Sequence, residues 1–208
     1  MAKNMKKIRS YRELNSVAKK GQILFTGSSL MEMFPIEEYV LSDGLGLTVY
    51  NRGIGGTTTD DFLEEIDTVL FDLEPSKLFI NIGTNDINFR EDGEPWQNHL
   101  LANYSRILSM VRDRLPKTKV YVMAYYPVNT TIPEAGNGFG ARTNEAINDT
   151  NLKIRTLAEQ FGFKYIDVND GIKDENGNLK AEYTIEGMHM YAGGYKPVYE
   201  ALKPYILE

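Results

Sequence analysis

Five short apolar runs, rich in β-branched and aromatic residues, recur along the chain between segments of helical periodicity. The runs are Gln22–Thr26, Leu47–Asn51, Lys77–Ile82, Lys119–Ala124 and Lys164–Val168. Most are continuously apolar rather than alternating, which is typical of strands buried on both faces of a parallel sheet. The alternation of strand and helix therefore predicts an α/β fold, a three-layer α/β/α sandwich around a five-stranded parallel sheet with right-handed crossovers.

Apolar residues at helical spacing predict helices over residues 62–73, 100–115, 147–161 and 195–202. Thr58 or Thr59 can cap the first, and Gly162 can end the third in the left-handed conformation. A further helix through Ile8, Tyr11, Leu14 and Val17 is expected to pack outside the core. Without repeats or Pro/Ser-rich linkers, we expect a single domain over residues 21–208, with residues 1–20 as a helical arm packed on it.

Charge and composition exclude several function classes. Lys and Arg number 23 against 29 Asp and Glu, a net charge of −6, so a nucleic-acid partner is not expected. The absence of cysteine excludes disulfides, thiolate metal sites and Cys nucleophiles, and it fits a reducing compartment. His99 and His189 lie far apart, so no metal site is expected.

The N-terminal residues are not expected to act as a targeting signal. Met1–Lys7 is basic, but residues 8–20 are polar and lack the apolar core of a signal peptide. No apolar run approaches the roughly 20 residues that span a bilayer. We therefore expect a cytoplasmic protein with no membrane partner.

Small and polar residues follow the predicted strands, at the sheet edge where ligands of such folds bind. They are Gly27-Ser28-Ser29, Gly53 to Thr57, Gly83 to Asp86, Tyr125 to Pro127 and, further on, Glu186 to His189. Acyl transfer needs a nucleophile, a base and donors for an oxyanion. Ser29, His189, the Gly55-Gly56 pair and Asn85 are of the types that supply them, since an imidazole titrates near neutrality and glycine lets backbone approach a ligand closely.

Taken together, the blocks Gly27-Ser28-Ser29-Leu30, Gly55-Gly56, Gly83-Thr84-Asn85-Asp86 and Glu186-Gly187-Met188-His189 resemble those of the SGNH hydrolases, or GDSL esterases. The resemblance covers residues 21 to about 202. It implies a flavodoxin-like sandwich, Ser29 as nucleophile and His189 as base. It also implies an oxyanion hole made by the amides of Ser29 and Gly56 with Asn85, and no cofactor or metal.

Two positions depart from the family pattern. Ser28 stands where the family name records Asp, which leaves the chemistry untouched. Glu186 stands where the third triad member is normally Asp. We expect Glu186 to orient His189, with three alternatives left open: a Ser–His dyad oriented by a backbone carbonyl, Asp170, or Glu182.

Other polar residues have structural explanations. Helix capping accounts for residues 57–61, and Gly53 to Gly56 has neither the place nor the spacing of a dinucleotide fingerprint. Asp86 is expected to bond loop amides, and His99 is expected to lie on the surface.

The predicted activity is hydrolysis of short acyl esters, acetyl foremost, of a carbohydrate or similar polar alcohol through an acyl-enzyme. The predicted rim, residues 129–143, is rich in Gly, Asn and Thr with Ile132 and Phe139 as its main apolar members, and Phe89 and Trp96 can form a wall. The alternatives are a lysophospholipase or thioesterase of longer chains and a non-catalytic binding module. The expected partner is a small-molecule ester; a homo-oligomer is compatible with the sequence, which carries no argument for one.

Overall fold

The computed structural model describes residues 4–136 and 138–208 and contains a five-stranded, fully parallel sheet. The strands are β1 (Ile23–Gly27), β2 (Val49–Asn51), β3 (Lys77–Asn81), β4 (Lys119–Met123) and β5 (Lys164–Ile166), in the order β2-β1-β3-β4-β5. The predicted fold class is confirmed, and the strand ends lie within two residues of those of the predicted runs.

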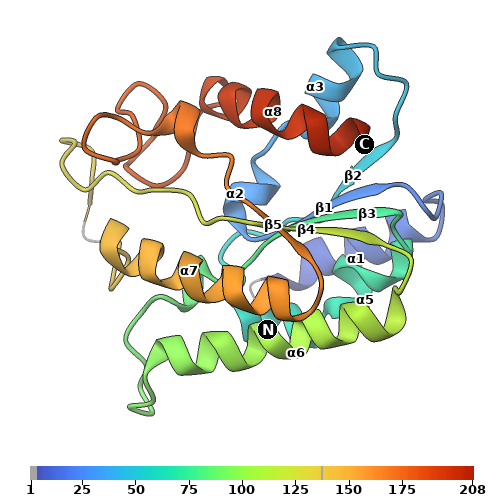
Figure 1. Ribbon diagram of the computed structural model, residues 1–208, viewed down its shortest axis with the longest axis horizontal. Helices are drawn as coiled ribbons and strands as arrows, with labels where there is room; N and C mark the ends of the chain where they lie inside the picture. Colours follow the sequence, from blue (N-terminus) through green and yellow to red (C-terminus); the bar gives the residue numbers. More distant parts are fainter. Residues whose placement is uncertain (1–3, 137) are drawn as a thin grey trace.

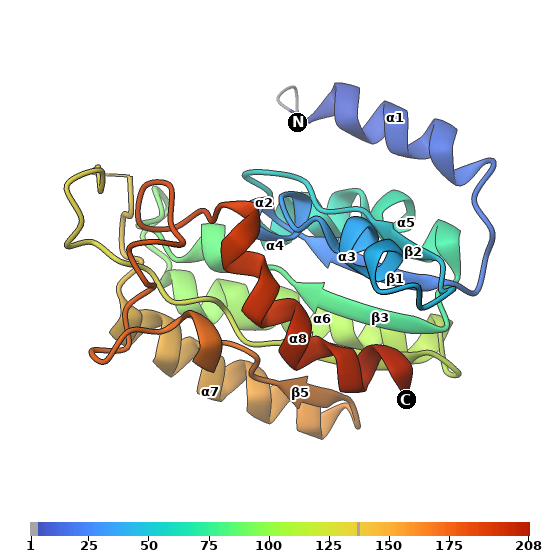
Figure 2. The same cartoon turned by 90° about the horizontal axis from the view of Figure 1, so that it is seen from above.

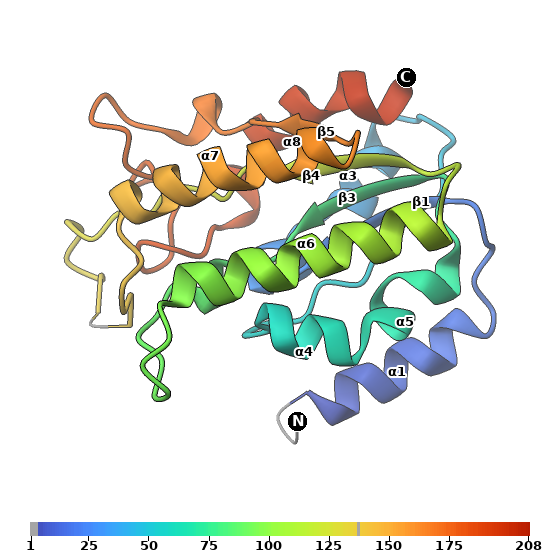
Figure 3. The ribbon, with the colours of Figure 1, turned by 60° about the horizontal axis from the view of Figure 1, so that its bottom comes forward.

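Helices cover both faces of the sheet, which makes three layers (Figure 1, Figure 3). One face carries α1 (Met5–Asn15), α4 (Thr59–Glu64), α5 (Ile66–Val69), α6 (Trp96–Arg114) and α7 (Asn144–Gln160). The other carries α2 (Ser29–Glu32), α3 (Ile36–Ser42) and α8 (Ala192–Leu207). Single 3-10 turns complete the chain: η1 (Phe71–Leu73), η2 (Thr84–Asp86) and η3 (Asp170–Ile172).

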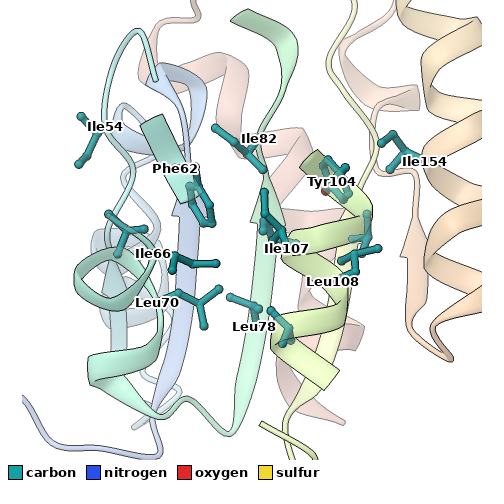
Figure 4. Packing of buried hydrophobic residues seen from close by; sticks show 14 of the residues in the cluster. Ile54, Phe62, Ile66, Leu70, Leu78, Ile82, Tyr104, Ile107, Leu108 and Ile154 are labelled. Atoms are coloured by element: carbon teal, nitrogen blue, oxygen red, sulfur yellow. The ribbon is translucent and has the colours of Figure 1, made fainter. Parts of the chain in front are cut away.

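Successive strand residues point to opposite faces and feed two separate cores. Phe25, Phe79 and Tyr121 are register partners whose rings stack in a row on the face of α8, with ring centroids 4.5 and 4.6 Å apart. Leu78, one residue before Phe79, instead faces α5 and α6 on the opposite side (Figure 4). Burial on both faces explains why the strands read as continuous apolar runs.

The helix predicted over residues 62–73 is interrupted. Thr58 caps α4 in a capping box with Asp61, as the sequence indicated, but the helix ends at Glu64. Glu65 leaves helical geometry, with φ −111° and ψ 19°, and α5 and η1 follow as separate short turns. The apolar residues stay on one side because each piece still packs on the same core.

The N-terminal helix is more integrated than its sequence suggested. Ile8 and Tyr11 of α1 are buried in the core shared with α5 and α6, which corrects the expectation that this helix packs outside the core. Leu14 and Val17 are exposed, but the end of α1 stays attached to the domain, because Asn15 Nδ2 donates to the Thr68 carbonyl at 2.8 Å. Figure 2 shows α1 along the outside of the domain.

The other predicted helices are present at the expected places. α6 and α7 begin three or four residues before their first predicted apolar position, because Pro95 and Thr143 precede them. Thr143 caps α7 through its side chain, and Gly162 follows the helix with φ +77°, the left-handed conformation expected of it.

Candidate active site

The site lies at the carboxyl edge of the sheet, where the loops after the strands gather at the left of Figure 1. Ser29 is the first residue of α2 and follows β1 after the single residue Ser28, and His189 comes from the long loop before α8. His189 Nε2 lies 2.9 Å from Ser29 Oγ, although the two residues are 160 positions apart in the chain. The fold therefore brings the predicted nucleophile and base within hydrogen-bond distance.

Glu186 completes this arrangement. Its Oε1 lies 2.5 Å from His189 Nδ1 and 3.1 Å from the His189 backbone nitrogen, so one carboxylate oxygen holds both the ring and the turn. The alternatives do not reach the ring: Asp170 pairs with Lys173 at 3.5 Å, and the side chain of Glu182 is exposed. The longer Glu side chain fits because it folds back onto its own tight turn.

That turn is fixed by contacts on both sides. The Gly187 amide donates to Thr184 Oγ1 at 2.7 Å, and the Gly187 carbonyl accepts from the Asn129 amide at 2.7 Å. Gly187 has φ +96°, and a Cβ there would lie 2.2 Å from the Asn129 carbonyl oxygen. Only glycine fits this close approach of two loops, which positions Glu186 and His189.

Amide donors face the same place. The amides of Ser29 and Gly56 make no hydrogen bond to the described residues, so both remain to donate to a bound group. Asn85 Nδ2 donates to the Thr57 carbonyl at 3.0 Å and keeps its second N–H. Ser29, Gly56 and Asn85, which the sequence suggested as oxyanion donors, all border one groove.

Glu32, which the sequence did not single out, holds the glycine loop from behind. Its Oε2 accepts a short hydrogen bond from the Gly55 amide, and its Oε1 lies 2.7 Å from Lys7 Nζ. The Tyr11 hydroxyl adds a bond to the Gly53 carbonyl at 2.8 Å. α1 thus braces the segment that carries Gly56, and no local motif could have revealed it because Lys7 and Glu32 are 25 residues apart.

The groove over Ser29 has a volume of about 620 Å³. Its walls are mostly small, polar or charged: Ser29, Gly55, Gly56, Asn85, Glu134, Gly136, Gly138, Phe139, Arg142, Glu186, Met188 and His189. Five of these residues come from the predicted rim. The expected wall of Phe89 and Trp96 is wrong, because Phe89 is 83% exposed and Trp96 packs on the core, and Ile132 does not line the groove either.

Beside the groove, Asp86 has the structural role expected of it. Its carboxylate accepts from the backbone amide and the hydroxyl of Thr59 at the start of α4. Burial raises the pKa of Asp86 to about 6, although the bonds from Thr59 act in the opposite direction.

His99 lies on the surface, where neighbouring acidic side chains partly cover its ring. Its side chain is 22% exposed and its ring nitrogens lie 2.8 Å from Asp60 and 3.2 Å from Glu94. The hydrogen bond to Asp60 raises the pKa of His99. His99 is separate from the groove.

Among residues 4–136 and 138–208, no group of three or more His, Asp or Glu side chains is arranged to hold a metal ion. Within the same residues, no helix has the length and apolar character to cross a membrane.

Comparison with known proteins decides the family. The model of the GDSL-like lipase/acylhydrolase family matches residues 35–196. The chain belongs to this family. The predicted resemblance and the assignment as an ester hydrolase are thereby confirmed. The matched span begins after Ser29, so the argument for this serine depends on its distance to His189 and not on the family match.

Two relatives align along most of this chain at low sequence identity. The chain is 27% identical over 206 residues to the N-acylneuraminate cytidylyltransferase of Escherichia coli O18:K1:H7, an alignment that covers 93% of this chain and 44% of that protein. The chain therefore spans less than half the length of this relative. It is 22% identical over 191 residues to the rat platelet-activating factor acetylhydrolase IB subunit alpha2, covering 91% and 78% of the two chains.

Solved structures share the fold. A Streptococcus pneumoniae protein, described provisionally as a platelet activating factor, is 33% identical and superposes with a TM-score of 0.86 over 99% of this chain and 94% of that one. The acetylxylan esterase Axe2 of Geobacillus stearothermophilus gives a TM-score of 0.70 at 17% identity, over 91% and 96% of the chains. The second likeness concerns the GDSL-type fold alone.

Proposed function

We propose that this chain is a serine esterase that removes short acyl groups, acetyl foremost, from a carbohydrate or similar polar alcohol. The observation that carries the proposal is the continuous relay from Glu186 through His189 to Ser29, beside two amides that are left to donate. A binding module without catalysis would not need this relay. The proposed roles follow from acyl-transfer chemistry.

In the first half-reaction, Ser29 Oγ attacks the ester carbonyl carbon while His189 Nε2 takes its proton. The negative oxygen of the tetrahedral intermediate accepts from the amides of Ser29 and Gly56 and from Asn85 Nδ2. The intermediate collapses, the C–O bond to the alcohol breaks, and His189 returns the proton to the leaving alcohol. Glu186 holds the ring and offsets its positive charge during both transfers.

In the second half-reaction, water takes the place of the alcohol. His189 removes a proton from the water as it attacks the acyl-enzyme, and the same donors bind the new oxyanion. Collapse releases the carboxylic acid and restores the Ser29 hydroxyl. The steps need no group beyond the residues and water.

The preference for a short acyl group is supported by the walls of the groove. Phe139 and Met188 are its main apolar side chains, whereas a long-chain site is lined by many apolar groups. The names of two relatives, an acetylxylan esterase and a platelet-activating factor acetylhydrolase, also describe removal of acetyl. The cytoplasmic location expected from the sequence stays a prediction, which fractionation of cells producing the tagged chain would test.

The test is hydrolysis of p-nitrophenyl esters from acetate to decanoate by the wild type, Ser29→Ala and Ser28→Ala. Ser28 is the matched control, because its buried hydroxyl has no partner within the described residues. We expect the highest rate on acetate, its loss in Ser29→Ala and its retention in Ser28→Ala. A maximum at long chains would move the substrate to lysophospholipids or thioesters, and equally slow wild type and Ser29→Ala would favour a binding module.

A further inference from the structure

Arg142 is a half-buried cation in the groove that makes no ion pair within the described residues. All of its hydrogen bonds go to uncharged acceptors. Nε donates to the Phe139 carbonyl at 2.9 Å and Nη2 to the Gly138 carbonyl at 2.8 Å. Nη1 donates to Asn85 Oδ1 at 3.2 Å and to Met188 Sδ at 3.5 Å.

A guanidinium has five N–H donors, so these four bonds leave one N–H on Nη2 and the whole positive charge uncompensated. Burial lowers the pKa of Arg142. Removing an unpaired charge from water is unfavourable, and a bound anion would offset that cost. Glu134 borders the same groove, but it is exposed and pairs with no described cation, so water screens its charge.

Several other arginines of this chain have a partner that offsets their charge. Arg12 and Arg155 pair with carboxylates at 2.7 and 2.9 Å. Arg52 has no carboxylate partner either, but it lies over the rings of Tyr11 and Tyr50, 4.9 and 5.4 Å from their centroids. Arg142 has neither kind of compensation and is held open to the groove by carbonyls on a short loop.

We propose that Arg142 binds an anionic group, a carboxylate or a phosphate, on the alcohol part of the ester substrate. This inference rests on the proposed function, in which the acyl group is an uncharged acetyl, so the anionic group must belong to the alcohol part. Arg142 supplies a positive charge and a free N–H donor on Nη2, and a charge-assisted hydrogen bond of this kind is favourable for such groups. The natural substrate is therefore an acylated sugar acid, an acylated sugar phosphate or an alcohol of the same charge.

Arg142 also fixes the orientation of the Asn85 amide through the bond to Oδ1. Replacing Arg142 will therefore lower turnover of neutral esters as well as anionic ones. The ratio of the two rates separates the effects, because the contribution through Asn85 is common to both substrates.

The experiment compares kcat/KM for 4-nitrophenyl acetate with that for its 3-carboxy derivative in the wild type, Arg142→Gln, Arg142→Lys and Arg155→Gln. Arg155→Gln is the matched control, since it removes the same charge from an exposed site on α7. We expect the anionic-to-neutral ratio to fall about 10- to 100-fold in Arg142→Gln, the usual effect of losing a hydrogen bond to a charged group. Arg142→Lys should fall less, and Arg155→Gln should match the wild type.

An unchanged ratio in Arg142→Gln would overturn the proposal and leave Arg142 with its effect on Asn85 alone. Failure of the proposed function looks different, because then even the neutral ester shows no hydrolysis that depends on Ser29.

A second comparison identifies the anion. Its substrates are monoacetylated methyl glucoside, monoacetylated methyl glucuronide and monoacetylated methyl glucoside 6-phosphate. Preference for either charged sugar, lost in Arg142→Gln, supports the proposal, and preference for neither contradicts it.

Discussion

Replacing Glu186 by Gln keeps the size of the side chain but removes the charge that faces His189. The ring becomes positive as it accepts the Ser29 proton, so the lost interaction is between two charges about 4 Å apart, worth about 4 kcal/mol at an effective dielectric constant near 20. The side chains are 31% and 36% exposed, and solvent reduces this to about 2–3 kcal/mol. The expected loss in kcat is about 30- to 150-fold.

The assay is steady-state hydrolysis of p-nitrophenyl acetate, with thermal unfolding to show that each variant is folded. Glu182→Gln is the matched control, because it removes the same charge from an exposed residue four positions earlier. Glu186→Asp should fall between the two, since the shorter side chain cannot reach both Nδ1 and the backbone amide without movement of the turn. A Glu186→Gln rate within threefold of the wild type would refute this reasoning and restore a Ser–His dyad.

Three further predictions follow from the same contacts. Between about pH 4 and pH 6 Asp86 is protonated in the folded state but ionised in the unfolded chain. The free energy of unfolding should therefore fall by up to about 3 kcal/mol as the pH rises through that window, and thermal melts of Asp86→Asn should lack this decrease. Lys7→Met should lower kcat about 3- to 10-fold, about the effect of a part-buried ion pair, because it leaves the Glu32 carboxylate beside Gly55 without its cation. The Lys7→Met/Glu32→Gln double variant should recover part of the loss, and additive losses in this double-mutant cycle would contradict the reasoning. Asn85→Ala should lower kcat about 100- to 1,000-fold with little change in KM, and a change confined to KM would exclude an oxyanion role.

Local sequence was sufficient for the sheet and for the residues at its edge. Continuous apolar runs such as Lys77–Ile82 are buried on both faces, and parallel strands necessarily deliver their following residues to one edge. Ser29, Asn85 and His189 could therefore be grouped before their distances were known. Glu186 was expected to join them, and the structure shows how its extra methylene is accommodated by the turn at Gly187.

What sequence could not supply depends on contacts between distant segments. The break after Glu64 occurs inside an unbroken apolar pattern, because each short piece packs separately on the core. Glu32 and Arg142 gain their meaning only from partners far along the chain, at Gly55 and Asn85. Neither has a motif, so only the folded arrangement distinguishes them from ordinary charged surface residues.

Covalent labelling of the nucleophile tests the central claim most directly. The wild type is treated with a fluorophosphonate, and the adduct is counted by intact mass and located by peptide mapping while hydrolysis of p-nitrophenyl acetate is followed. The account predicts one adduct per chain, on Ser29, with activity falling in proportion to labelling. An adduct on another residue, or hydrolysis that persists when Ser29 is fully modified, would contradict it.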